Sequence, residues 1–282
     1  MATKAKLDVR SRKEAARKAL KSCRLCPRNC GVDRTAGERG FCGLSDKPRC
    51  FREVLVFNEE EILTPSHQIY FSGCNLRCAF CTVSEWNEQP EAAEQVKVDW
   101  LVERVEYRIG QGAKNINILG GEPTVNLPAI IELVGRINSK ISVVLNSNMY
   151  YSDIAAELLE GLIDIYLADL KCGSSNCAKL ILGAEDYVGI ARENILKAYQ
   201  HFDLSGEFDL IVRHLIMPGH FDCCLKPTLD WLAKEMPDVK VSLRTDYIPP
   251  AEVNSAPRGY PSKGDIEKAE NYATKLGLNL IK

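Results

Sequence analysis

The feature that most constrains the fold of this 282-residue chain is a regular alternation of strand-like and helix-like segments. From Ile69 onward, short apolar runs rich in Val, Ile and Leu are separated by longer segments with helical periodicity. Strands that alternate with helices build βαβ units and a parallel sheet, and nearly continuous apolar strands indicate a sheet covered on both faces. Six units are too few for an eight-stranded barrel, so the sequence predicts an α/β fold, either an open, partial (β/α)6 barrel or a doubly wound sheet. The six runs are "IYFSGC", "NINILGG", "ISVVLNSN", "IDIYLADL", "FDLIVRHLIM" and "VKVSLRTDY".

Three regions that differ in composition and apolar pattern predict the domain organisation. Residues 1–50 are basic and cysteine-rich, residues 51–68 form a connecting strand or hairpin, and residues 69–282 form the partial barrel. Residues 1–28 carry ten Lys and Arg against two acidic residues. Such an arm could contact RNA or an acidic protein, but a solvated helix is the favoured interpretation of "VRSRKEAARKALKS".

From the composition we expect neither a membrane-spanning nor a secreted protein. No apolar run approaches the ~18 residues that a membrane span requires, and the N-terminus lacks the apolar core of a signal peptide. The twelve cysteines cluster at Cys-x2-Cys and Cys-x3-Cys spacings, which indicates metal or cluster ligands kept reduced rather than disulfides. We therefore expect a cytoplasmic protein without a membrane partner, and nucleic acid is not an expected partner.

Polar residues follow the predicted strands with unusual consistency, in "GCNLRC", "GGEP", "NSNMY", "DLKC", "RHLIMPGH" and "RTDY". The carboxyl ends of parallel strands meet at one edge of a sheet, where ligands bind. The sequence therefore predicts a functional site at that edge.

The first of these loops holds three cysteines, Cys74, Cys78 and Cys81. Three thiolates suit a cubane [4Fe–4S] cluster in which one iron lacks a protein ligand, a cluster counterpart of the open position in catalytic metal sites. A zinc site completed by a distant Cys or His is the alternative. The Cys-x3-Cys-x2-Cys spacing, with Phe80 before the last cysteine, resembles the signature of the radical S-adenosylmethionine (SAM) superfamily.

Further motifs strengthen the resemblance. "GGEPT" resembles the family's Gly-Gly-Glu-Pro motif, in which the carboxylate can accept from the ammonium group of methionine. "ADLK" resembles the Asp-x-Lys pair of pyruvate formate-lyase activating enzymes, which lies near SAM. The resemblance implies a cofactor-binding set: Gly120, Gly121, Glu122, Asn146, Asn148, Asp169, Lys171 and His214. For residues 146, 148 and 214, a local structural role is an equal alternative.

Within the superfamily, the chain is most similar to the uncharacterised iron–sulfur homologues of pyruvate formate-lyase activating enzyme. The resemblance implies reductive cleavage of SAM at a [4Fe–4S] cluster, and hydrogen abstraction from a protein, peptide or small molecule by the 5′-deoxyadenosyl radical. It also implies a one-electron donor such as flavodoxin or ferredoxin. The N-terminal cysteine segment departs from glycyl-radical activators and leaves that substrate class open. The alternative function is an iron–sulfur or zinc module that binds RNA or a partner protein without radical catalysis.

The remaining cysteines divide into two groups. Cys23, Cys26, Cys30 and Cys42 form a complete set of four, which predicts structural zinc or an auxiliary [4Fe–4S] cluster, with Cys50 as a spare ligand. We interpret the others, Cys172, Cys177, Cys223 and Cys224, as buried apolar side chains or free thiols. Among them, only Cys172 could face the active site. His67, His201 and His220 are expected to be surface or structural residues.

Overall fold

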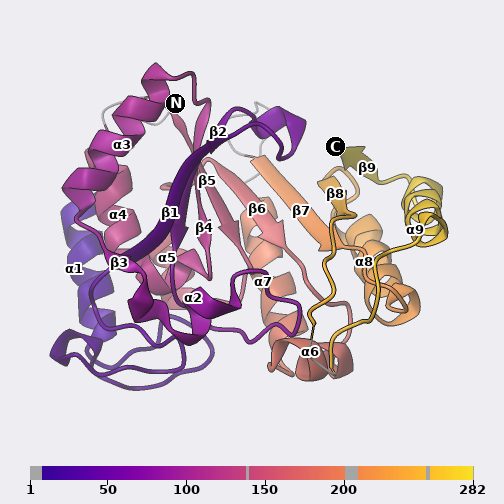
Figure 1. Cartoon of the computed structure of the whole chain (residues 1–282), viewed down its shortest axis with the longest axis horizontal. Helices are drawn as coiled ribbons and strands as arrows, with labels where there is room; N and C mark the ends of the chain where they lie inside the picture. The colour runs from indigo at the N-terminus through magenta and orange to yellow at the C-terminus, as the bar shows by residue number, and fades with distance from the viewer. Residues whose placement is uncertain (1–7, 138–139, 201–208, 252–254, 282) are drawn as a thin grey trace.

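The computed structural model describes residues 8–137, 140–200, 209–251 and 255–281, and within them one mixed sheet has the strand order β3-β1-β2-β4-β5-β6-β7-β8-β9 (Figure 1). The strands are β1 (Arg49–Val56), β2 (Ser66–Phe71), β3 (Glu94–Gln95), β4 (Asn115–Gly120), β5 (Ser142–Ser147), β6 (Ile165–Asp169), β7 (Asp209–Leu215), β8 (Lys240–Arg244) and β9 (Asn279–Ile281).

The six predicted strands are confirmed as β2, β4, β5, β6, β7 and β8, which pair in parallel. They lie side by side in chain order, whereas a doubly wound sheet requires a reversal of strand order. The described sheet does not pair its outermost strands, β3 and β9, with each other. The fold is therefore the open, partial α/β barrel. The sequence did not predict β9, which extends the parallel sheet beyond β8.

Helices connect the strands on the outside of the sheet (Figure 1). Local signals define them: Ser152 caps the start of α5, and Ser262 with Asp265 forms a capping box at α9. Helix α6 was not predicted as a separate element. The α-helices of the barrel are α2 (Ser84–Glu88), α3 (Val98–Gly110), α4 (Leu127–Arg136), α5 (Asp153–Leu159), α6 (Ser175–Leu182), α7 (Tyr187–Gln200), α8 (Lys226–Glu235) and α9 (Lys263–Lys275).

Alternate residues of the strands face two different environments. One set, including Ile69, Ile118 and Val212, is fully buried in the main core with apolar residues of the helices. On the other face, Leu63 of the short turn η3 (Glu61–Leu63) packs in a separate small cluster with strand residues that include Leu167. This second face also supplies the side chains that line the cavity described below.

The N-terminal helix α1 (Val9–Leu20) packs against α4 rather than standing free in solvent. Ala16 and Leu20 are buried on its inner side, and Arg10 on its outer side is exposed. The expectation of a solvated helix is thus correct for one side only. Two of the basic residues of the arm, Lys4 and Lys6, lie outside the described residues.

The segment after α1 has few regular elements, as expected for a stretch without apolar periodicity. Its one described helical turn is η2 (Arg34–Ala36). The buried Arg34 guanidinium donates to the carbonyls of Ser45 (2.7 Å) and Val125 (2.9 Å), which ties this segment to the barrel. In the described part of the chain, no helix is both long and apolar enough to cross a bilayer.

Candidate active site

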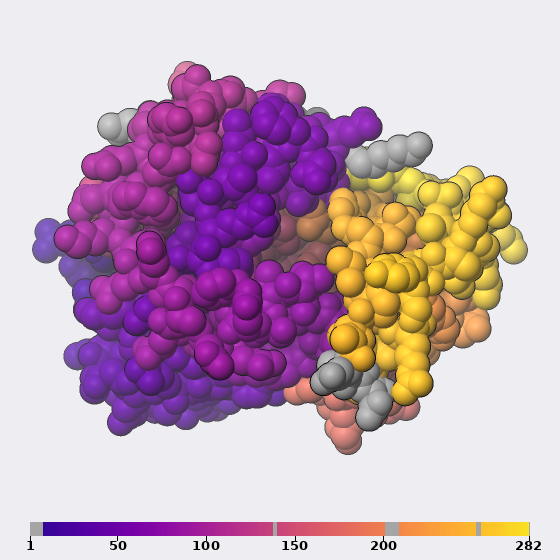
Figure 2. All heavy atoms as spheres, in the orientation of Figure 1, coloured from indigo at the N-terminus to yellow at the C-terminus, as the bar shows by residue number. Residues whose placement is uncertain are grey.

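A cavity of about 310 Å³ opens at the carboxyl ends of the parallel strands. In the space-filling view it is the hollow between the purple segments and the yellow C-terminal segment (Figure 2). Its floor consists of alternate strand residues, as the two-residue period of a strand requires: Tyr70, Leu119, Asn146, Asp169, Arg213, Leu215 and Arg244. The predicted edge of the sheet therefore carries the site.

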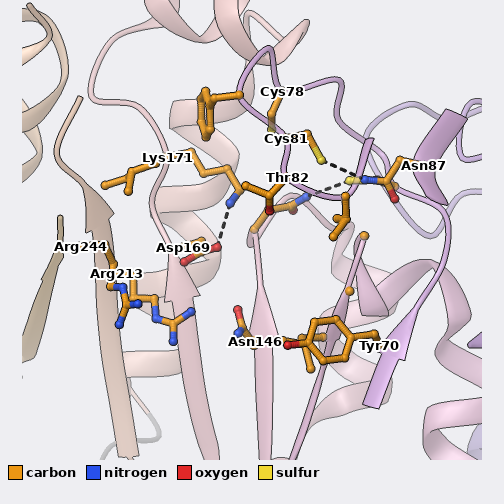
Figure 3. A pocket seen from close by; sticks show the side chains of 18 of the residues that line it. Tyr70, Cys78, Cys81, Thr82, Asn87, Asn146, Asp169, Lys171, Arg213 and Arg244 are labelled. Carbon is orange, nitrogen blue, oxygen red and sulfur yellow. Dashed lines mark hydrogen bonds and ion pairs between the residues drawn. The ribbon is translucent and has the colours of Figure 1, made fainter. Parts of the chain in front are cut away.

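The three cysteines of the loop after β2 line this cavity together. Hydrogen-bond donors surround their sulfur atoms: the Leu76 N–H points to the Cys74 Sγ (3.4 Å), and the Asn87 amide to the Cys81 Sγ (3.3 Å; Figure 3). Donors of this kind stabilise sulfur that carries negative charge, and they tune iron–sulfur clusters.

The pKa shifts of the thiols indicate that they suit a positively charged metal centre. Burial raises the pKa of Cys74 well above its usual range, and it raises the pKa of Cys78 to about 12. These shifts favour the neutral thiols, whereas a bound metal ion deprotonates a coordinating thiol. Three clustered thiols with nearby N–H donors are therefore a suitable ligand set for an iron–sulfur cluster.

Lys171 and Asp169 form an ion pair beside the cysteine loop, with 2.8 Å between Nζ and Oδ2 (Figure 3). Burial alone would lower the pKa of Lys171, but the charge and hydrogen bond of Asp169 raise it, so the ammonium group stays charged. The buried Tyr187 hydroxyl accepts from the Lys171 N–H (3.0 Å) and donates to the Asp169 carbonyl (2.7 Å). Tyr187 therefore fixes the backbone that carries the pair, a role that the sequence did not reveal.

Gly120 and Gly121 line the cavity with backbone alone. A Cβ atom on Gly120, whose φ is +123°, would lie 2.1 Å from the Phe71 carbonyl oxygen, and one on Gly121 would lie 2.2 Å from the Gly73 carbonyl oxygen. Glycine is therefore required at both positions for the end of β4 to pack this closely on the end of β2 and on the cysteine loop.

Glu122 lies behind the cavity rather than in it, and is fully buried. Its carboxylate accepts from the Thr124 hydroxyl (2.7 Å), the Ser147 hydroxyl (2.9 Å) and the Asn148 N–H (2.9 Å). Burial raises the pKa of Glu122, and these hydrogen bonds offset part of the rise. In this position Glu122 joins the turns after β4 and β5. The predicted contact between its carboxylate and SAM stays a prediction.

Asn146 and Asn148 both line the cavity, but His214 does not. His214 alternates along β7 with Arg213 and Leu215, which do line it, so its imidazole lies on the opposite face of the strand. There it is buried, with Nδ1 2.6 Å from the Leu170 carbonyl oxygen. This position gives the predicted cofactor-binding role of His214 no support.

The comparison with protein families agrees with the site. The model of the radical SAM superfamily matches residues 69–232, more than half of the chain. The chain belongs to the radical SAM superfamily. It is therefore an enzyme of radical chemistry, whose cofactors are a [4Fe–4S] cluster and SAM.

Individual relatives extend this similarity. An uncharacterised protein of Methanocaldococcus jannaschii is 33% identical over 95% of this chain and 79% of its own length. A second protein of that organism, named as a candidate glycyl-radical enzyme activating enzyme, is 27% identical over 42% of this chain and 48% of its own length. The structure of a radical SAM methyltransferase from Sphaerobacter thermophilus shares the fold, with a TM-score of 0.58, 14% identity, and coverage of 83% of this chain and 76% of that one.

The cavity of this radical SAM protein also contains charged residues that sequence reasoning missed. Arg213 donates to Glu60 (2.6 Å) and also contacts Glu59, and Arg244 donates to Asp246 (2.7 Å). Arg213 and Arg244 belong to the strand-end stretches "RHLIMPGH" and "RTDY" that predicted the site, but the sequence does not show which residues of these stretches face the cavity. Nothing in the sequence indicates Glu59 and Glu60, because the loop after β1 reaches the cavity only through the tertiary fold.

The four N-terminal cysteines approach one another beside the radical SAM barrel. Burial raises the pKa of Cys26 to about 12, with further contributions from the nearby Cys42, Cys23 and Cys30. The Phe41 N–H points to the Cys30 Sγ (3.3 Å). These contacts do not identify the bound group, so zinc or an auxiliary cluster stays a prediction.

Proposed function

We propose that this enzyme reductively cleaves SAM to methionine and a 5′-deoxyadenosyl radical, which then abstracts hydrogen from a protein or peptide substrate. One observation carries the proposal: a single cavity contains the three thiols at one end and the Lys171–Asp169 pair beside them. Thiols alone would also suit a binding module for RNA or a partner. A charged pair at the same cavity offers a hydrogen-bond donor and an acceptor to a ligand with both charged and polar groups, such as SAM.

Each part of the cavity has a role in this proposal. Cys74, Cys78 and Cys81 hold the cluster, and the Asn87 amide stabilises the Cys81 sulfur. Gly120 and Gly121 let the ligand approach the backbone of β4. When bound, the reduced cluster supplies the electron for the cleavage of SAM.

Other groups orient and shield the ligand. Lys171 and Asp169 orient its polar groups, and Asn146 of β5 and Asn148 just after β5 line the same cavity. The half-buried floor limits the contact of water with the bound ligand, which protects a reactive radical from side reactions.

The expected test is anaerobic reconstitution with iron and sulfide, followed by addition of SAM and dithionite. Wild-type protein is expected to form 5′-deoxyadenosine, and Cys74→Ala, Cys78→Ala and Cys81→Ala are each expected to abolish it. Cys50→Ser is the matched control, since the Cys50 thiol donates to the Arg52 carbonyl (3.1 Å) within β1 and does not line the cavity. Product formation that survives loss of the three cysteines would exclude the proposal.

The proposed class of substrate rests on the similarity to activating enzymes and on the opening of the cavity at the molecular surface (Figure 2). A macromolecular fraction of the source cells is expected to stimulate 5′-deoxyadenosine formation, and digestion of that fraction with protease is expected to remove the effect. Stimulation by the small-molecule filtrate alone would contradict a protein or peptide substrate and leave SAM cleavage intact.

We further propose a flavodoxin or ferredoxin as the electron donor, and a cytoplasmic location.

We also propose that Cys23, Cys26, Cys30 and Cys42 bind a zinc ion or an auxiliary [4Fe–4S] cluster. The near approach of these four cysteines supports this site. Metal and sulfide analysis of Cys23→Ser/Cys26→Ser is expected to show the loss either of zinc or of iron together with sulfide. Unchanged contents would exclude both groups.

A further inference from the structure

A second group of potential metal ligands lies outside the cofactor cavity. The ligand atoms of Cys177, His220, Cys223 and Cys224 all lie within 4.8 Å of one another. None of the four lines the cavity. From the sequence we interpreted the three cysteines as buried apolar side chains or free thiols, and His220 as a surface or structural residue. The pattern did not connect them, and Cys177 lies more than forty residues from His220.

Two elements bring these side chains together. In the π-helical turn η6 (Phe221–Leu225), the N–H groups of Cys224 and Leu225 both donate to the His220 carbonyl (3.1 Å each). Side chains three and four positions after His220 therefore lie on the same side of the turn as the imidazole. Cys177 comes from the first turn of α6, where Ser174 caps the helix and the helix dipole favours a thiolate.

The spacing of the atoms fits one metal ion. His220 Nδ1 lies 3.5 Å from the Cys223 Sγ and 3.6 Å from the Cys224 Sγ. A tetrahedral zinc ion, with bonds of about 2.3 Å to sulfur and about 2.0 Å to nitrogen, places such ligand atoms about 3.6 Å apart. A cubane cluster interposes several iron and sulfide atoms between its ligands, and it therefore needs a wider arrangement.

We propose that Cys177, His220, Cys223 and Cys224 bind a single tetrahedral metal ion, with zinc as the expected metal. Three thiolates and one imidazole complete a four-coordinate site with no open position, which is the pattern of a structural rather than a catalytic ion. The ion would fasten α6 to the turn after β7.

The packing around the group is consistent with a built site. Cys224 is fully buried, and the Cys172 thiol hydrogen-bonds to it. A Cβ atom on Gly173 would lie 2.2 Å from the Cys224 carbonyl oxygen, so the loop after β6 and the turn η6 are in close contact. Cys172 directly follows Lys171, which places the proposed ion behind the cofactor cavity and adjacent to its charged pair.

Metal content tests the proposal without reference to SAM cleavage. The full-length chain, expressed with zinc and purified anaerobically, is expected to lose about one equivalent of zinc in Cys177→Ser/Cys223→Ser. Cys50→Ser is expected to keep it. The same loss is expected when the comparison is repeated in the Cys23→Ser/Cys26→Ser background, which removes the N-terminal site.

If Cys177→Ser/Cys223→Ser fails to fold, two substitutions at His220 test the same proposal. His220→Cys retains four ligands and is expected to keep the zinc, whereas His220→Ala is expected to lose it. Three results would overturn the proposal: equal zinc in wild type and variants, a disulfide among these cysteines in anaerobically purified protein, or loss of iron with sulfide in place of zinc.

Discussion

At the scale of single residues, oppositely charged groups are paired along the cavity. Lys171 lies beside Asp169, and Arg213 beside Glu60. A charged group removed from water needs a partner of opposite charge or hydrogen bonds to offset its lost hydration. These pairs therefore allow a cavity within the barrel to hold several charges, and to offer them to a polar ligand.

The Lys171–Asp169 pair is expected to contribute to SAM binding. Loss of a charge-assisted hydrogen bond costs about 1.5–3 kcal/mol, so Lys171→Met is expected to weaken SAM binding about ten- to hundredfold. Equilibrium binding to the reconstituted enzyme measures the effect. Lys179→Met is the control, because Lys179 pairs with Glu185 at the surface (2.9 Å) and is expected to change nothing. Equal affinity in both variants would exclude a role for Lys171.

Glu60 is expected to make stability depend on pH. Burial opposes its ionisation, but hydrogen bonds from Arg213 and Ser242 and the Arg213 charge lower the pKa of Glu60 from 4.5 to about 2. A carboxylate with a lowered pKa stabilises the fold above its unfolded pKa, and the stabilisation is lost as the pH falls from about 4.5 toward 2. The free energy of unfolding is expected to fall by about 3 kcal/mol across this window from this group alone.

Urea unfolding of wild type and Glu60→Gln between neutral pH and about pH 3 isolates this contribution. The variant, which has no titrating carboxyl group at this position, is expected to be less stable at neutral pH and to lose less stability on acidification. Parallel pH profiles for the two proteins would show that Glu60 does not carry the effect.

At the scale of elements, close packing between helices depends on single small residues. Gly135 of α4 faces α1, where an added Cβ would lie 2.2 Å from Val9 Cγ1. An added Cβ on Gly189 of α7 would meet no described atom within 4 Å beyond the backbone of its own helix. Alanine substitution at Gly189 therefore tests helix propensity alone, whereas the same substitution at Gly135 also tests the packing of α4 on α1.

Gly135→Ala is expected to destabilise the protein although alanine favours helices, since an overpacked contact costs about 1–3 kcal/mol. Adding Val9→Ala is expected to recover most of that loss. Gly189→Ala, the control, is expected to stabilise by up to about 1 kcal/mol. Thermal unfolding measures all three. If Gly135→Ala were as stabilising as Gly189→Ala, α1 would not pack on α4 as described.

At the scale of the whole molecule, the N-terminal cysteine segment covers the loop that is proposed to hold the cluster. Arg28 donates to the carbonyls of Asn75 and Gly183 (2.8 Å each), and Leu44 packs so closely on Gly73 that an added Cβ would lie 2.5 Å from it. We therefore expect residues 73–83 to lose order when the N-terminal segment loses order.

Removal of the group bound by the N-terminal cysteines tests this connection. Cys26→Ser is expected to raise amide hydrogen exchange by about tenfold or more in residues 25–45 and in residues 73–83, because the covering segment loses its attachment. Helix α8 is expected to be unaffected and serves as the internal control, with Cys50→Ser as the matched variant. Unchanged exchange in residues 73–83 would mean that the two cysteine loops are independent.

The alternation of strands and helices, the edge of the sheet that carries the site and the three-cysteine loop could all be predicted from the sequence, because periodicity and short motifs are local properties. Which side chains meet depends on the tertiary fold. It turned His214 away from the cavity that Arg213 faces, since the phase of strand alternation cannot be read from a strand apolar on both sides. It also brought Glu60 to Arg213 and Cys177 to His220. Such contacts join distant segments, and they depend on how helices and loops pack over the sheet.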